Sequence, residues 1–216
     1  MTSNFFSVRG IDQCHFCEHF WSTARGRLEP WDTVLAQTDD CVVVPTKGAL
    51  VPGWLLVIPK VHALRSMDLG ERDSNSLWES VELAVDIVER NFGPATILEH
   101  GPVRHGSALG CGMDHVHMHV LPLPFSFTQE LRTEPSVSGW MPNRVEASQS
   151  ISLGEYVLVQ EPGELITLAL IDNPSRQLAR QLIARKLGIA EQYDYAIFPQ
   201  RDNVERTLDC IRESAA

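Results

Sequence analysis

Short apolar runs separated by turn residues predict most of the strands of this chain, because strands are short and are bounded by glycine, proline and small polar residues. The predicted strands cover residues 31–36, 41–44, 54–59, 95–98, 114–121, 155–160 and 165–170. The last two runs predict a hairpin that turns through the Glu-Pro-Gly-Glu sequence at residues 161–164.

A broad apolar stripe opposite a row of acidic residues predicts the main helix over residues 68–91, and Phe92-Gly93-Pro94 ends it. Two more helices are predicted at residues 174–187 and 203–212, and the polar segment 126–150 is predicted to be a long loop or lid. Together these elements predict an α+β fold. Its antiparallel sheet has the main helix packed on it, and the hairpin and later helices form a C-terminal elaboration.

The predicted strand 114–121 carries histidines at every second position, His115, His117 and His119, with apolar residues between them. Alternate residues of a strand face the same side of a sheet, so the three imidazoles share one face and the apolar side chains share the other. Near pH 7 each imidazole can accept a proton, donate one or attack an electrophile. The strand therefore presents a concentrated set of reactive groups.

Three interpretations of this row are open from the residues alone. Solvated histidines on an outer face would explain one histidine well, but they explain three in register poorly. A metal site is the second interpretation, since His-x-His on a strand can supply ligands to zinc or another transition metal. The third is a histidine that attacks phosphorus and is flanked by two histidine partners.

The loop that leads into this strand favours the third interpretation. Residues 107–113 read SALGCGM, and small residues with glycine let backbone N–H groups approach a phosphate. The candidate phosphate-binding residues are Ser107, Gly110, Cys111, Gly112 and Met113.

Cys14 and Cys17 have the spacing of a metal-binding knuckle. The spacing alone leaves a metal site and a pair of half-buried or redox-active thiols equally open. A tetrahedral site needs two further ligands, and His15 and His19 are the nearest candidates along the chain.

Charge and composition narrow the class of protein. The 216-residue chain has a net charge of −10, with 18 Lys and Arg against 28 Asp and Glu, which argues against non-specific nucleic-acid binding but allows a small anionic substrate. An odd count of five cysteines fits a reducing compartment. No apolar run reaches the roughly 18 residues of a membrane-spanning helix, and the first residues lack the features of a secretory signal. We therefore expect a cytoplasmic protein without membrane or nucleic-acid partners.

The motifs above resemble those of the histidine triad (HIT) superfamily. Residues 115–121, HVHMHVL, match its signature His-φ-His-φ-His-φ-φ at every position, where φ is apolar. The resemblance extends through VIPKVH at residues 57–62 to the Cys-x-x-Cys of residues 14–17, which is similar to the zinc-containing branch that includes galactose-1-phosphate uridylyltransferase. It departs at residues 110–112, where many small members have Gly-Gln-Ser. Phosphate binding would then depend on backbone N–H groups and Ser107.

The resemblance implies a HIT-like catalytic core with an N-terminal zinc knuckle over residues 1–124. Residues 125–216 would be a C-terminal elaboration of the same domain. The resemblance also implies a structural Zn²⁺ held by Cys14, Cys17, His62 and His115, in which all four positions are taken by protein.

The implied activity is hydrolysis or nucleotidyl transfer at the α-phosphate of a dinucleoside polyphosphate, a phosphoramidate or a nucleotide sugar. By this resemblance His117 attacks phosphorus and forms a covalent nucleotidyl-histidine. His119 hydrogen-bonds a phosphate or leaving-group oxygen and assists proton transfer, and His115 orients the site. A histidine at the third position favours a hydrolase or a phosphorylase over a transferase, and the scheme requires no Mg²⁺.

Two other functions stay open, a three-histidine metal-dependent enzyme and a non-catalytic nucleotide-binding sensor. In each case the expected partner is a small nucleotide, and a homodimer is an open alternative. The sequence favours no role in the site for His100 or His105.

The role of residues 125–216 is also open. We expect them to wall the leaving group, through Trp140 and the helix bearing Arg176, Arg180 and Arg185, or else to complete the core or a dimer interface. For the arginines themselves, a solvated helix face is favoured over a phosphate contact.

Overall fold

Residues 14–21, 28–110, 112–141 and 154–214 are described by a computed structural model. The strands are β1 (Ala36–Gln37), β2 (Cys41–Pro45), β3 (Leu55–Pro59), β4 (Thr96–Gly101), β5 (Met118–Leu121), β6 (Val137–Met141), β7 (Glu155–Gln160) and β8 (Thr167–Ile171). The helices are α1 (His15–Trp21), α2 (Glu71–Asn91), α3 (Phe127–Arg132), α5 (Leu178–Lys186) and α6 (Arg201–Ser214). Three-residue 3₁₀ turns lie at Pro30–Asp32, Ser66–Asp68 and Ala190–Gln192.

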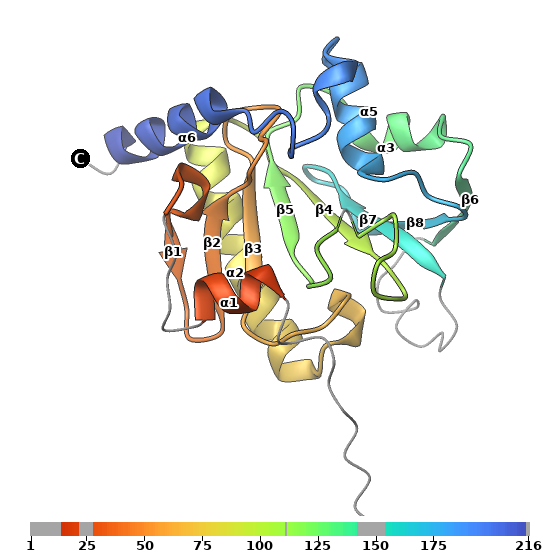
Figure 1. Ribbon diagram of the computed structural model, residues 1–216, viewed down its shortest axis with the longest axis horizontal. Helices are drawn as coiled ribbons and strands as arrows, with labels where there is room; N and C mark the ends of the chain where they lie inside the picture. The colour runs from red at the N-terminus through yellow and green to blue at the C-terminus, as the bar shows by residue number, and fades with distance from the viewer. Residues whose placement is uncertain (1–13, 22–27, 111, 142–153, 215–216) are drawn as a thin grey trace, which may run out of the picture.

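The eight strands form one antiparallel sheet in the order β1-β2-β3-β5-β4-β7-β8-β6 (Figure 1). β7 pairs with β4 over five residues, from Ile97 opposite Gln160 to Gly101 opposite Tyr156. Strands from the C-terminal elaboration therefore continue the sheet that contains the histidine strand.

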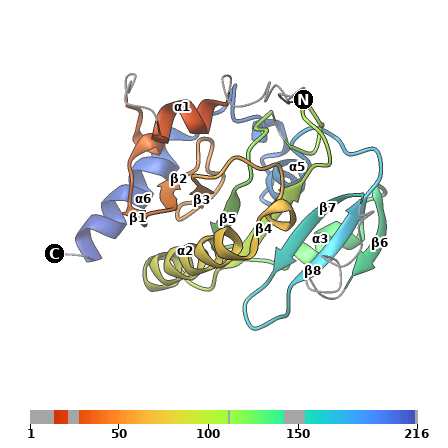
Figure 2. The ribbon, with the colours of Figure 1, turned by 90° about the horizontal axis from the view of Figure 1, so that it is seen from below.

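One face of the sheet is covered by α2 (Figure 2). Its buried residues Leu77, Val81, Ala84 and Val88 recur at helical spacing, so they form one apolar stripe that packs against alternate residues of the strands. The main helix was predicted from residue 68, but the structure begins it at Glu71. The three residues 66–68 instead form a 3₁₀ turn.

The opposite face is covered by α1 over β2 and β3, and by α3 and α5 over β4, β7 and β8, whereas α6 packs at the end of the sheet and is bonded to the loop between β2 and β3. Figure 1 shows α1 and α5 in front of the sheet on either side of β5. Met118 and Val120 of β5 face α2, so His119 between them faces the side of α1 and α5. The histidine strand thus runs beneath the gap between two helical covers.

The α+β fold class predicted from the sequence is confirmed, and so is the hairpin of β7 and β8. Other predicted elements were wrong. Of residues 31–36, Trp31 and Asp32 belong to the 3₁₀ turn, residues 33–35 are irregular, and only Ala36 reaches β1. The described part of the predicted loop 126–150 contains α3 and β6, because the hydroxyl of Ser126 caps α3 at the N–H of Gln129 and β6 pairs with β8. No helix of the described residues is both long and apolar enough to cross a bilayer.

The predicted strand 114–121 also begins late, since β5 starts at Met118. The preceding backbone leaves the sheet ladder, and the N–H of Val116 donates to the carbonyl of Ala63 at 2.7 Å. His115 and His117 therefore sit on an irregular segment that enters the strand, and only His119 lies within it.

Candidate active site and metal centre

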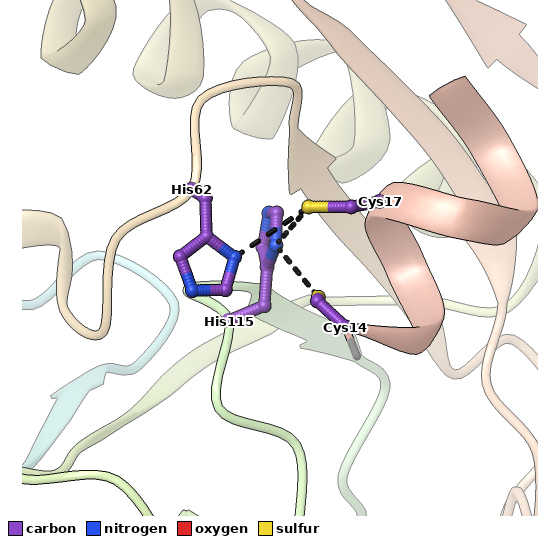
Figure 3. Close-up of side chains that lie close together, drawn as sticks. All are labelled: Cys14, Cys17, His62 and His115. Atoms are coloured by element: carbon purple, nitrogen blue, oxygen red, sulfur yellow. Dashed lines mark hydrogen bonds between the residues drawn. The ribbon is translucent and has the colours of Figure 1, made fainter. Parts of the chain in front are cut away.

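Two cysteines and two histidines from four separate positions converge beside the histidine strand (Figure 3). Cys14 precedes α1 and Cys17 lies in its first turn. His62 follows β3 and His115 precedes β5. One donor atom from each residue lies within 4.8 Å of the others. The structure thus brings together the four residues that the resemblance implies as metal ligands.

The hydrogen bond at Nε2 of His115 leaves the lone pair of the neutral ring on Nδ1, which can therefore be a metal ligand. Nε2–H donates to the carbonyl oxygen of Pro59 at 2.8 Å, so in a neutral ring the lone pair lies on Nδ1. Nδ1 is 3.3 Å from the sulfur of Cys14 and 3.5 Å from that of Cys17. A hydrogen bond from the nitrogen that does not ligate the metal, like that from Nε2 to Pro59, is typical of metal-ligating histidines.

The chemistry of this set fits a closed tetrahedral metal site. Burial and the neighbouring Cys14 raise the pKa of the Cys17 thiol to about 12, because two adjacent thiolates in a buried place repel each other. A divalent cation would remove that repulsion, and two sulfur and two imidazole donors suit Zn²⁺. His15 and His19 are outside the cluster. His15 lines a cavity described below, and His19 lies 3.3 Å from the carboxylate of Asp32.

Beside this cluster a cavity of about 310 Å³ opens on the sheet face that α1 and α5 cover. Its volume is at the lower end of the range usual for small-molecule sites. Its lining is apolar at one end, with residues of α1 and β2. At the other end it is polar and basic, with His100, His117, His119 and Arg180, and polar residues His15, Asp32, Thr46, Lys47 and Tyr195 line the cavity as well. The two ends suit two different parts of one ligand.

His117 is held in one tautomer by the backbone. Its Nδ1–H donates to the carbonyl oxygen of His115 at 2.8 Å, which leaves the lone pair on Nε2. Burial lowers the pKa of His117 to about 4, so the ring is neutral at physiological pH. The ring of Phe16 from α1 packs edge-on against the imidazole of His117, with their ring centroids 5.5 Å apart.

His119 is held in the opposite tautomer. The indole N–H of Trp54 donates to Nδ1 of His119 at 3.0 Å, so the proton of a neutral His119 lies on Nε2. Its ring centroid is 4.8 Å from that of His117. Burial first, and then the neighbouring His117, His100 and Arg180, lower the pKa of His119 well below its usual value. The cavity therefore contains one imidazole with a free lone pair beside one with a free N–H.

His100 lines the same cavity, contrary to the expectation from the sequence. It lies on β4 next to β5, and its ring centroid is 5.1 Å from that of His119. Its Nδ1–H donates to the carbonyl of Leu109 at 3.0 Å, which leaves a lone pair on Nε2. The register of β4 against β5 decides this position, and the histidine sequence motif contains no signal for it. His105 lies instead by the metal cluster, stacked on His62 with centroids 6.2 Å apart.

The predicted phosphate loop is only partly at the cavity. Met113 lines it, but the N–H of Met113 donates to the carbonyl of Gly110 at 2.9 Å. The hydroxyl of Ser107 donates to the carboxylate of Glu155 and so is turned toward β7. Gly112 has a φ of +82°, the region that favours glycine, and Cys111 lies outside the described residues.

The three arginines of the C-terminal half have different surroundings. Arg180 of α5 is 4% exposed and lines the cavity, so a solvated position was the wrong expectation for it. Arg176 is exposed. Arg185 is exposed as well, 3.7 Å from the carboxylate of Glu134. Trp140 lies on β6 under the guanidinium of Arg132, and it is not among the residues that line the cavity.

Comparisons with known proteins show what this chain is similar to. Residues 27–125 match the family model described as the HIT domain. Bis(5'-adenosyl)-triphosphatase of Dictyostelium discoideum is 32% identical over 73 residues, which are 34% of this chain and 48% of that protein. The match thus spans about half the length of that curated relative.

Two solved structures that are similar to this chain differ in how much of it they cover. A HIT family protein from Bacillus anthracis is 19% identical, with 52% of this chain and 74% of that chain covered and a TM-score of 0.43. A hypothetical histidine triad nucleotide-binding protein from Sulfolobus tokodaii is 14% identical, with 89% and 93% covered and a TM-score of 0.39.

The triad motif lies inside the matched segment, and the described part of that segment folds into the strands that carry it. Residues 27–125, somewhat less than half of the chain, therefore match the HIT domain of the histidine triad superfamily.

Proposed function

We propose that the chain is a nucleotide hydrolase or nucleotidyltransferase that acts at the α-phosphate of a nucleotide conjugate, with His117 as the nucleophile. One observation carries the proposal. The Nδ1–H of His117 is bound to a backbone carbonyl at 2.8 Å, which leaves an unprotonated Nε2 in a ring that lines the cavity. A neutral imidazole with a fixed tautomer is ready to attack without first losing a proton.

In the first step Nε2 of His117 bonds to the α-phosphorus, and the bond from phosphorus to the leaving-group oxygen breaks. The electron pair of that bond stays with the leaving group. In the second step water attacks the nucleotidyl-histidine, the phosphorus–nitrogen bond breaks, and Nε2 regains its lone pair. The water proton passes to solvent or to an acceptor in the cavity, and His100, whose ring centroid is 5.1 Å from that of His119, is a candidate acceptor.

His119 would stabilise the charge on the phosphoryl oxygens through its Nε2–H. This role needs a donor fixed before the reaction, which the hydrogen bond from Trp54 supplies. His115 would act on the site indirectly, because its carbonyl holds His117 and its ring belongs to the metal cluster. Gly112 and the neighbouring backbone would contribute phosphate contacts.

The apolar end of the cavity would hold the nucleoside. Phe16 and Phe20 from α1 and Val44 and Leu56 from the sheet line this end. Aromatic and aliphatic side chains of this kind suit the faces of a nucleobase. The early strands would then select the base.

The ion that the Cys/His cluster would hold is proposed to be a structural Zn²⁺, bound by Cys14, Cys17, His62 and His115. Bound there, it would supply folding energy and no chemistry of its own, since the protein fills all four positions. Within this scheme the chain's own residues perform each step, and no Mg²⁺ is required.

The test is a substrate panel with the wild-type chain and His117→Ala. Dinucleoside polyphosphates, nucleotide sugars and adenosine 5′-phosphoramidate would each be assayed with and without added phosphate. Turnover by the wild type that His117→Ala lacks supports the proposal. Acid-labile labelling of the wild type by one nucleoside monophosphate would establish the covalent step. His105→Ala, which removes an exposed histidine outside the cavity, is the matched control.

The same assay separates the alternatives. A three-histidine metal enzyme would lose activity on chelation while its fold persists, whereas a structural metal ties activity loss to unfolding. Binding of nucleotides with no turnover of any substrate would identify a sensor and contradict the proposal.

A further inference from the structure

A buried arginine from outside the segment that matches the HIT domain is fixed in the wall of the cavity. Nε of Arg180 donates to the carbonyl of Tyr193 at 2.8 Å, and a terminal nitrogen donates to the carbonyl of Gly48. The guanidinium lies over the ring of Trp54, 5.0 Å from its centroid, and 5.7 Å from that of Tyr195. These contacts keep a permanent positive charge at one position in the cavity wall.

The contacts also give the cavity a direction. Phe16 of α1 touches His117, His117 touches His119, and His119 is bonded to Trp54, over which Arg180 lies. If the nucleoside occupies the α1 end, then Arg180 lies beyond His119 on the opposite side of the attacked phosphorus. In an in-line displacement the leaving group departs away from the nucleophile. Arg180 is therefore on the leaving-group side.

His119 cannot protonate that leaving group readily. Its Nδ1 already accepts the N–H of Trp54 at 3.0 Å, and an indole can only donate. An imidazolium would place two N–H groups against each other, so the neutral form with its single Nε2–H is favoured. If it lost that proton the ring would become an anion. The site thus offers the departing group a hydrogen bond from His119 and the positive charge of the Arg180 guanidinium.

We propose that Arg180 binds the phosphate of the leaving group, so that the substrate is a nucleoside 5′-phosphoanhydride whose leaving group departs as an anion. The proposal rests on the proposed role of His117. The phosphorus–oxygen bond breaks, the bridging oxygen keeps the electron pair, and no proton is needed because a phosphate anion is stable in water. A phosphoramidate would be a poor substrate, since its amine leaving group carries no phosphate for Arg180 to bind.

A binding experiment tests the phosphate contact without turnover. In the His117→Ala chain, the dissociation constants of adenosine 5′-monophosphate and 5′-diphosphate would be measured by calorimetry, alone and combined with Arg180→Met. We expect Arg180→Met to weaken the diphosphate about tenfold or more and the monophosphate less than about threefold, because only the diphosphate carries the second phosphate. Arg185→Met, on the same helix but at the surface, should change neither.

Arg180 also ties α5 to the loop at Gly48, so Arg180→Lys is the second variant and covers the case in which Arg180→Met does not fold. Lysine keeps the charge without the planar fork, and we expect the diphosphate to bind at least about threefold more weakly, with monophosphate binding retained. Equal weakening of both nucleotides, or of neither, in the folded variant would mean that Arg180 is only a structural tie and would overturn the inference.

Turnover separates this inference from the proposed function. For the wild type, the kcat/KM for a dinucleoside triphosphate should exceed that for adenosine 5′-phosphoramidate, and Arg180→Met should reduce this preference about tenfold. A wild type that prefers the phosphoramidate contradicts the leaving-group inference and leaves the nucleophile in place. A His117→Ala chain that keeps its full activity would contradict the proposed function itself, whatever the effect of the Arg180 variants.

Discussion

Trp54→Phe is the most discriminating single change that the cavity offers. Trp54 is 1% exposed, and its N–H is the group that places the proton of His119 on Nε2. Phenylalanine keeps an aromatic ring under the guanidinium of Arg180 but removes the N–H. The change therefore leaves the charge above the ring and alters one hydrogen bond. In these terms Trp54 is a positioning residue that acts through His119.

The size of the effect follows from that bond. A hydrogen bond between neutral groups contributes about 0.5–1.5 kcal/mol net, and the loss of that much transition-state stabilisation slows a reaction roughly twofold to tenfold. We expect kcat to fall by about threefold to tenfold, with KM changing less, because the Nε2–H acts most strongly on the developing charge. The smaller ring should also cost about 1–2 kcal/mol of stability through incomplete filling of the core.

Steady-state kinetics of a double-mutant cycle with His119→Ala provides the assay. If Trp54 acts through His119, then Trp54→Phe should change kcat less than about twofold once His119 is absent. Nitrogen NMR of labelled histidine gives an independent measurement, since it reports which ring nitrogen of His119 carries the proton. An equal loss of kcat with and without His119, or an unchanged tautomer in Trp54→Phe, would refute the reasoning.

Three further predictions follow from the same geometry. His117→Ala should reduce kcat by more than about 100-fold while the melting temperature stays near that of the wild type, because the side chain faces a cavity. His119→Ala should cost less, and a larger loss there would contradict the assignment. Cys14→Ser should remove one zinc per chain and lower the melting temperature by about 5 °C or more. The control Cys210→Ser, which changes a cysteine outside the cluster, should keep the metal. Elemental analysis measures the metal content and calorimetry measures the melting temperature. Burial lowers the pKa of His117 from 6.5 to about 4, so the neutral nucleophile should persist as the pH falls and kcat/KM should decline only below about pH 5. The contribution of the neutral His117 ring to the free energy of unfolding should be complete above pH 6.5 and should be lost as the pH falls toward 4. A pH profile of kcat/KM that falls with a midpoint near 6.5 would show that burial does not lower the pKa of this ring.

Local sequence patterns predicted much of the fold correctly. The stripe of Leu77, Val81, Ala84 and Val88 predicted α2, because helical spacing puts these residues on one face. The runs around Pro162-Gly163 predicted the hairpin of β7 and β8, because its strands and turn are adjacent in sequence. Where patterns were ambiguous, tertiary contacts decided. Residues 114–117 alternate like a strand, but the backbone there turns aside to hold His117.

The candidate site divides in the same way. The sequence by itself determined the three histidines, the Cys-x-x-Cys pair and, through resemblance, the partnership of His62 with His115, because these depend on residue type and short spacing. Only the tertiary structure decided that Trp54, His100 and Arg180 join them, since strand register places His100 in the cavity and the packing of α5 places Arg180 over Trp54, 126 positions earlier in the chain (180 − 54). The tautomers were likewise decided by hydrogen bonds to Trp54 and to the carbonyls of His115 and Leu109. A sequence motif specifies which imidazoles are present. Which nitrogen of each ring carries the proton is fixed by the partner that the fold places beside it.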